Sequence, residues 1–218
     1  MRSAAAERAR RAGFVLPFVV VATAIIAILA GTLAVTSAGR GAWVAIALLA
    51  LTSSALEFSV ADPNRIGLIL RLSTIGIGLV AALPENLFER EALRRDLALR
   101  TLVRTLLEHP VVVASAIAGL LLGLVPLALP IESSSDALRA AGIALLVVGL
   151  PPLLTSRFIE ATTRAAVVTL AGTMLLRTSI FGALDPLTSL AIGAGFTCIL
   201  VVGGSVATRI SNAEEEER

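Results

Sequence analysis

Apolar runs, each long enough for a membrane helix, alternate along the chain with short polar turns. In the first part of the sequence they cover residues 13–39, 41–61 and 66–83, and Arg71 interrupts the last of them. A helix rises ~1.5 Å per residue, so about 20 residues cross a hydrocarbon core of ~30 Å. These runs predict an N-terminal membrane block over residues 1–83, with two spans and a third segment that either crosses or re-enters.

Four further apolar segments predict a C-terminal four-helix membrane block over residues 110–208. Pro110 opens this block, and Asp185-Pro186 precedes its last segment; both are typical of helix starts. Residues 209–218 are rich in glutamate and predict a disordered, solvated tail. The expected fold class is all-α: a polytopic integral membrane protein with six to seven transmembrane helices.

A charged segment, residues 84–109, separates the two hydrophobic blocks and contains five acids and five arginines. As a helix, it places apolar residues on one stripe that only Arg95 interrupts. Such an amphipathic helix is expected at a membrane interface or along neighbouring helices. The stripe consists of Phe88, Ala92, Leu99, Leu102, Val103 and Leu106.

The composition supports this fold class. The chain of 218 residues is 56% hydrophobic with a mean hydropathy of +0.91, far above a soluble domain of its size. Its basic excess sits in the N-terminal arm and at helix ends, where it indicates orientation in a membrane, so no nucleic-acid partner is expected. With one cysteine, Cys198, and one histidine, His109, the chain offers too few ligands for a zinc site. No metal or other cofactor is expected.

The distribution of arginines predicts an orientation, because cytoplasmic loops carry the basic excess. If residues 66–83 re-enter, the N-terminus, residues 84–109 and the C-terminus all lie in the cytoplasm of a six-span cell-membrane protein. This arrangement fits the arginines better than seven spans, which place residues 84–109 outside when the N-terminus is cytoplasmic. The N-terminal arm and the run after it also resemble a signal peptide. That run exceeds the roughly 7–15 apolar residues of a signal core, so a retained first span is expected.

Three ionisable residues inside apolar segments are the candidate substrate-binding residues: Glu57, Arg71 and Arg177. A tight hairpin centred near Pro63 brings Glu57 and Arg71 to a similar depth and predicts an ion pair, with Ser53 and Ser54 on the same helical face as Glu57. One interpretation is a structural lock of the hairpin, and the other is a carboxylate that handles a proton or cation. Arg177 either snorkels to the near membrane surface or lines a cavity for an anionic solute.

Small residues at four-residue intervals predict close helix contacts. Ser115, Gly119 and Gly123 form one such face, on which we expect a protein partner or a second copy of the chain, in addition to the lipid bilayer. A second small-residue face lies in the last apolar segment and consists of Ser189, Gly193 and Thr197.

The sequence contains neither a nucleophile turn of the GxSxG type nor an HExxH motif, so no catalytic residues are predicted and the chain is not expected to be an enzyme. We expect a small permease- or channel-like protein for a small solute or ion, because discontinuous helices and intramembrane charges often mark binding sites. The alternative is a non-catalytic membrane scaffold or subunit that binds a partner through its charged central helix. The scarcity of polar residues in the spans favours this alternative.

Overall fold

The structure is a computed structural model, and it describes residues 2–37, 40–58, 64–82, 99–124 and 136–216. Nearly all of the described residues lie in helices, and no strand occurs among them. The all-α fold class is therefore confirmed for this part of the chain.

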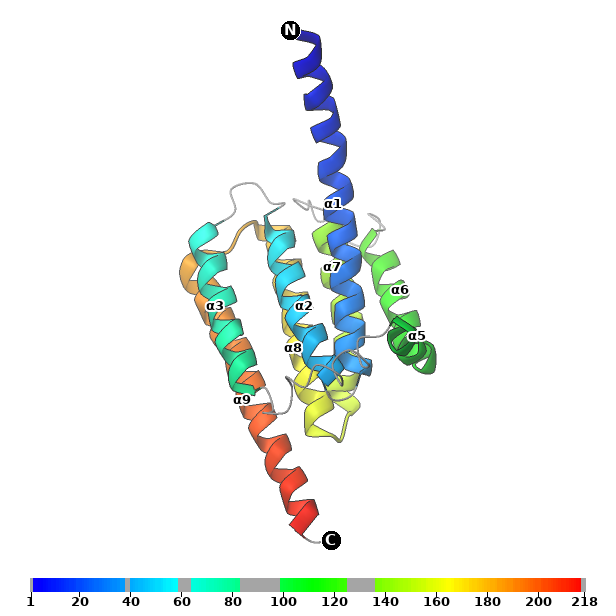
Figure 1. The fold of residues 1–218 in the computed structure, drawn as a ribbon, viewed down its shortest axis with the longest axis vertical. Helices are drawn as coiled ribbons and strands as arrows, with labels where there is room; N and C mark the ends of the chain where they lie inside the picture. Colours follow the sequence, from blue (N-terminus) through cyan, green and yellow to red (C-terminus); the bar gives the residue numbers. More distant parts are fainter. Residues whose placement is uncertain (1, 38–39, 59–63, 83–98, 125–135, 217–218) are drawn as a thin grey trace.

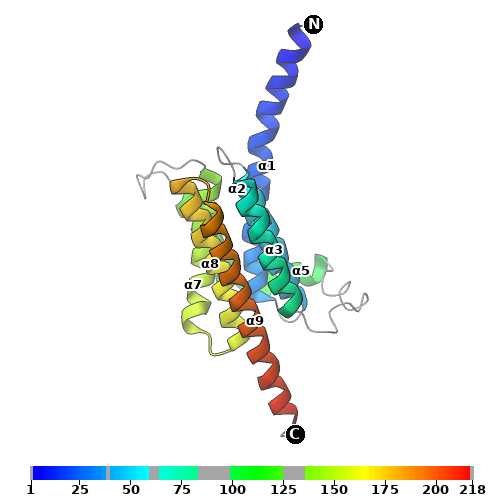
Figure 2. The same cartoon turned by 90° about the vertical axis from the view of Figure 1, so that its left-hand side faces the viewer.

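Two layers of three helices each make up the body of the molecule (Figures 1 and 2). Helices α1, α2 and α3 form one layer, and α7, α8 and α9 form the other, so that α1 packs on α7, α2 on α8 and α3 on α9. Helix α6 packs on α7 at the edge of the second layer, and the short α5 lies near the ends of α1 and α6. The helices are α1 (Arg2–Thr36), α2 (Arg40–Glu57), α3 (Arg65–Ala82), α5 (Leu99–Glu108), α6 (Pro110–Leu124), α7 (Asp136–Thr155), α8 (Ile159–Phe181) and α9 (Pro186–Glu216).

The two layers share one core. Buried apolar side chains from α1, α2, α7, α8 and α9 belong to a single contiguous cluster, which includes Ile46, Leu145, Val168 and Leu200. The N-terminal and C-terminal blocks of the sequence therefore fold face to face as one body. The N-terminus of α1 and the C-terminus of α9 lie at opposite ends of it (Figure 1).

Four of the described helical stretches are long and apolar enough to cross a membrane: Phe18–Thr36, Asp136–Thr155, Ile159–Phe181 and Pro186–Gly203. Shorter apolar helices cover Gly41–Glu57 and Pro110–Leu124. The large apolar side chains that remain exposed on these helices are what a surrounding hydrocarbon requires. The described fold is thus compatible with a membrane protein.

Glycines let the second layer pack tightly. A Cβ atom on Gly142 of α7 would lie 2.7 Å from the Leu176 nitrogen of α8, and one on Gly172 would lie 2.9 Å from the Gly142 oxygen. Both separations are too short for a side chain, so α7 and α8 are in backbone contact there. Gly119 of α6 is equally close to Ala144 of α7, at 2.7 Å from its Cα.

Three features differ from the sequence expectations or lie beyond what the structure describes. Residues 209–216, predicted to be a disordered tail, continue α9 as a helix to Glu216. Alanine and glutamate are good helix formers, and extending an existing helix avoids the nucleation penalty. Residues 65–82 form one unbroken helix with no reversal inside it. Of the central helix only 99–108 is described, so Phe88 and Ala92 of its predicted stripe lie outside the described residues.

Candidate functional site

The predicted pair of Glu57 and Arg71 joins α2 to α3 at the end of the bundle where the connection between these helices lies. Glu57 is the last residue of α2, and Arg71 lies two turns into α3. Asn64 begins α3 as its N-cap, since its Oδ1 accepts a hydrogen bond from the Gly67 amide at 3.1 Å. Its Nδ2 donates to the Leu184 carbonyl, which ties the start of α3 to the turn before α9. These contacts fix the register in which Arg71 faces α2.

The ion pair is bidentate and buried. Arg71 Nη1 donates to Glu57 Oε1 at 2.7 Å, and Arg71 Nη2 donates to Oε2 at 2.9 Å. Arg71 is 0% exposed and Glu57 is 4% exposed. Ser54 completes the group, because its hydroxyl accepts from Nη2 at 3.2 Å and donates to the Ala50 carbonyl. The predicted pairing is confirmed, and a planar guanidinium matched to a carboxylate is the strongest geometry such a pair has.

Helix α9 closes the site from the other layer through its small-residue face. A Cβ atom on Gly193 would lie 3.1 Å from the Arg71 Cα and would overlap the Thr74 hydroxyl. Thr197 donates a hydrogen bond to the Thr74 carbonyl at 2.6 Å, so a polar contact also joins the helices. The predicted close approach at Ser189, Gly193 and Thr197 is confirmed, and its partner is α3.

One polar atom of the site has no hydrogen-bond partner among the described residues: the buried Nε of Arg71. Each oxygen of the Glu57 carboxylate accepts a hydrogen bond from one terminal nitrogen of Arg71. In this state the carboxylate neutralises the arginine and holds two helices together.

Arg177 is not part of this group. Its Nη1 donates to the Gly182 carbonyl at 3.2 Å, in the turn after α8, and its guanidinium lies 5.9 Å from the centre of the Phe181 ring. The side chain thus reaches along its own helix toward the α8–α9 turn. This geometry agrees with the snorkelling interpretation.

Two other arginines make contacts that the sequence did not predict. Arg139 of α7 donates from Nε to the Gly123 carbonyl at 3.0 Å, near the end of α6. Arg164 of α8 donates from Nη1 to the Ser37 carbonyl just after the end of α1. The last carbonyls of a helix lack intrahelical partners and carry the negative end of its dipole, so a guanidinium satisfies both needs.

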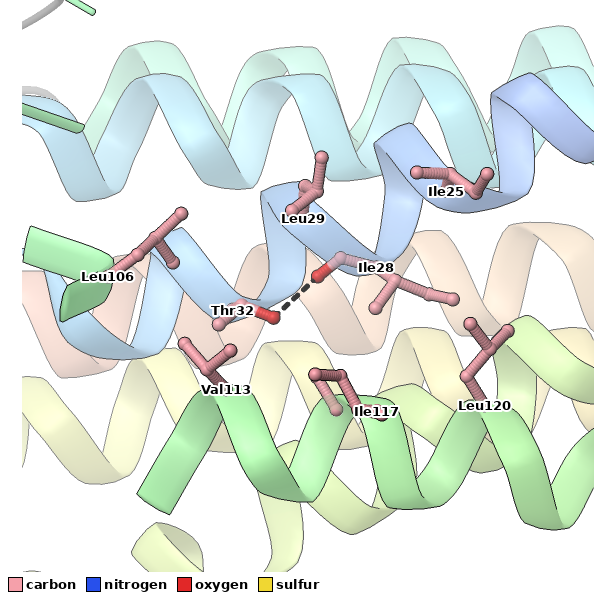
Figure 3. A pocket seen from close by; sticks show the side chains of 9 residues that line it. Ile25, Ile28, Leu29, Thr32, Leu106, Val113, Ile117 and Leu120 are labelled. Carbon is pink, nitrogen blue, oxygen red and sulfur yellow. Dashed lines mark hydrogen bonds between the residues drawn. The ribbon is translucent and has the colours of Figure 1, made fainter. Parts of the chain in front are cut away.

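A pocket of about 240 Å³ lies between α1, α5 and α6, away from the ion pair (Figure 3). Among the described residues that line it, Thr32 is the one with a polar side chain, and its hydroxyl donates to the Ile28 carbonyl at 2.8 Å. The pocket therefore offers a ligand nothing but hydrocarbon. The sequence did not predict this pocket. A hydrophobic pattern shows which face of a helix is apolar, but it does not show between which helices a space remains. The lining residues are Ile25, Ile28, Leu29, Thr32, Leu106, Val113, Ala116, Ile117 and Leu120.

The small-residue face predicted for a partner is in part already occupied. Gly123 packs against the backbone of Ala140 and Gly119 against Ala144, both on α7 of the same chain. Ser115 donates its hydroxyl to the Val111 carbonyl one turn back. The two glycines thus serve a contact within the chain.

Among the described residues, no group of three or more histidine, cysteine, aspartate or glutamate side chains is arranged to hold a metal ion. No protein-family model matches the chain, and searches of curated proteins and of solved structures find no match.

Proposed function

We propose that this chain is a non-catalytic membrane subunit or scaffold that presents α5 to a partner protein. The observation that carries the proposal is the closed state of the Glu57–Arg71 pair. Both carboxylate oxygens accept hydrogen bonds from the arginine, and Arg71 has no exposed surface. A transport site needs a carboxylate with a free face, whereas a structural pair is stable only when both charges are satisfied in this way.

Three further arginines of the helical body support the same function. Arg139, Arg164 and Arg177 each donate to a backbone carbonyl at a helix end or in the turn that follows it. Their charge thus stabilises helix ends and contacts between helices. Charges arranged in this way favour a fixed bundle over a binding pathway.

Helix α5 is the surface best suited to a partner. Leu106 lines the pocket against α1, while Leu107 is 74% exposed and Val103 is also exposed. Beside them, Arg104 and Glu108 form an exposed i,i+4 ion pair at 2.7 Å. An exposed apolar strip bordered by charges is typical of a helix that docks in a groove.

The partner contact is tested in gently solubilised native membranes. We expect the chain to migrate as part of an assembly larger than its own 22.5 kDa on a native gel. Leu107→Ser should release it, whereas Arg104→Ser on the same helix should release much less, because exposed ion pairs contribute little. Migration of the wild-type chain alone would contradict the proposal.

We further propose that α1, α2, α3, α6, α7, α8 and α9 all cross the membrane. The unbroken α3 and the opposite positions of the two termini support seven crossings over six (Figure 1). Residues 84–109 contain five arginines, and Arg157 and Arg164 before and in α8 add two, against four in the N-terminal arm, so the positive-inside rule favours the α5 end as the cytoplasmic one. The N-terminus then lies outside, opposite to the orientation expected from the sequence.

The permease-like alternative is favoured by one observation, the unpartnered Nε of the buried Arg71. A buried donor left free in hydrocarbon is unfavourable and often marks a functional group. Purified protein in liposomes with an internal pH-sensitive dye distinguishes the two functions. The scaffold proposal expects proton flux no faster than in empty liposomes. Flux that Glu57→Gln abolishes without lowering the folded yield would establish transport and overturn the scaffold proposal.

A further inference from the structure

The pocket between α1, α5 and α6 has the shape and chemistry of a lipid-chain site. Its walls are aliphatic side chains from three helices, and its one hydroxyl is already bonded to the Ile28 carbonyl (Figure 3). A water molecule needs two to four polar partners to occupy a cavity, and the described lining provides at most one, the Thr32 hydroxyl oxygen as an acceptor. The occupant must therefore be apolar.

The pocket is open toward the side of the bundle. Ile25 and Leu29 of α1 are each 46% exposed, and Ile117 of α6 is 55% exposed, while Ala116 between the helices is buried. The rim is thus accessible and the floor is closed. In a membrane the medium at this rim consists of acyl chains, which can enter from the side without crossing a polar barrier.

Its dimensions are closer to those of a single hydrocarbon chain than to those of a whole protein helix. From Ile25 to Thr32 the wall on α1 extends about 10 Å at ~1.5 Å per residue. A helix is roughly 10–12 Å across, so that length of it fills on the order of 800–1,100 Å³. The pocket measures about 240 Å³, several times less. A single hydrocarbon chain, which is much thinner than a helix, fits this space.

Helix α5 closes one end of the pocket and defines how a lipid would lie. Leu106 contributes to the lining, and the opposite face of the same helix exposes Arg104 and Glu108. A short helix with an apolar face toward the bundle and charges on the other belongs at the level of the lipid headgroups. A chain lying in the pocket thus has its polar end near α5.

We propose that one acyl chain of a membrane phospholipid occupies the groove between α1 and α6 below α5. This inference rests on the proposed membrane insertion. Bound there, the chain links the edge helix α6 and the amphipathic α5 to α1, with which they share few direct contacts. The lipid thereby positions α5, the surface proposed for a partner.

The test uses the full-length protein in liposomes of phosphatidylcholine that carries a photoreactive diazirine in one acyl chain. After illumination, cross-linked peptides are mapped by mass spectrometry. We expect adducts enriched at residues 25–32 and 113–120 over the exposed apolar face of α3 at Ile77 and Val80. Adducts spread evenly over these faces would overturn the proposal.

Two matched variants locate the site on one helix. Ala116→Phe fills the groove from its floor, and Ala118→Phe makes the same change at an exposed position outside the lining. We expect Ala116→Phe to lower groove adducts at least fivefold and Ala118→Phe to leave them unchanged. Equal adducts in both variants would contradict the proposal. If Ala116→Phe loses its helical circular dichroism, the wild-type adduct map alone decides.

Two further outcomes are distinguishable from these. Release of the chain from liposomes by a carbonate wash would show that membrane insertion itself is wrong, and the inference would fail with it. Retention in the membrane, with protein-to-protein cross-links at the groove in place of lipid adducts, would make the groove a contact between copies and overturn only the lipid proposal.

Discussion

At the scale of single residues, the Glu57–Arg71 pair is the feature that most constrains the molecule. Removing one member of a buried ion pair leaves the other charge uncompensated, which typically costs about 3–5 kcal/mol. We predict that Glu57→Gln lowers the free energy of unfolding by about this amount, because Arg71 has no route to solvent. Thermal unfolding of purified protein in detergent measures the change.

A double variant provides the control for this prediction. Glu57→Leu combined with Arg71→Met removes both charges and keeps similar volumes, so it should be considerably more stable than Glu57→Gln alone. A double variant as unstable as the single one would mean that the packing of the side chains, and not their charge, holds α2 to α3.

The pair was predictable because its two members are close in sequence and a turn signal lies between them. The contacts of Arg139 and Arg164 were not, because each guanidinium binds a backbone carbonyl, which no pattern of side-chain charges reveals, and the carbonyl bound by Arg164 is also 127 residues away. Any helix end offers such carbonyls, and a sequence does not indicate which helix ends meet. Ser54 was expected near the pair and does accept a hydrogen bond from Arg71.

The carboxylate of Asp185 should make the stability of the protein depend on acidic pH. Asp185 precedes α9 and accepts hydrogen bonds from the side-chain hydroxyl and from the backbone N–H of Thr188. These bonds lower the pKa of Asp185 below the ordinary value of 3.8. A lowered folded-state pKa gives stability that is complete above the unfolded-state pKa and is lost as pH falls through the folded-state value. We predict that Asp185→Asn is less stable than wild type at pH 7 and that the difference shrinks below pH 4. A constant difference across this range, measured by thermal unfolding, would exclude the linkage.

At the scale of helices, the contact between α3 and α9 depends on small residues. A methyl group on Gly193 would overlap the Thr74 hydroxyl and press on the Arg71 backbone, whereas Gly76 on α3 has open space around its Cα. We predict that Gly193→Ala destabilises the protein by about 1–3 kcal/mol through overpacking. Gly76→Ala should stabilise it by about 0.5–1 kcal/mol through helix propensity. Similar effects of the two changes in thermal unfolding would show that α3 and α9 are not in close contact.

The small-residue faces illustrate what helical periodicity reveals and what it omits. The spacing of Ser189, Gly193 and Thr197 indicated a close approach, which the structure confirms. Spacing does not name the neighbour, and the similar face at Gly119 and Gly123 binds α7 of the same chain. A pattern of small residues in one sequence is equally compatible with both kinds of contact.

At the scale of the whole molecule, the layered arrangement depends on α3. Residues 66–83 carry Arg71, and a charge within an apolar segment argues against a full crossing when that segment is considered alone. In the fold, Glu57 on the neighbouring helix neutralises this charge, so the argument loses its force. The six-span expectation rested mainly on the distribution of arginines along the chain, and the Glu57–Arg71 pair weakens only the second argument for it, the charge inside the segment.

The side of the membrane on which the N-terminus lies distinguishes seven spans from six. Three crossings by α1, α2 and α3 place the N-terminus and α5 on opposite sides of the membrane, whereas two crossings place them on the same side. In a Cys198→Ser background, we expect an impermeant maleimide to label Ser3→Cys in intact cells and Thr101→Cys only after lysis. If both cysteines react only after lysis, the protein has six spans and a cytoplasmic N-terminus. As a control for reactivity, both cysteines must react in lysed cells. The seven-span proposal requires that α3 carries no uncompensated charge across the membrane. The double variant Glu57→Leu with Arg71→Met removes both charges, so it should give the same sidedness in this experiment.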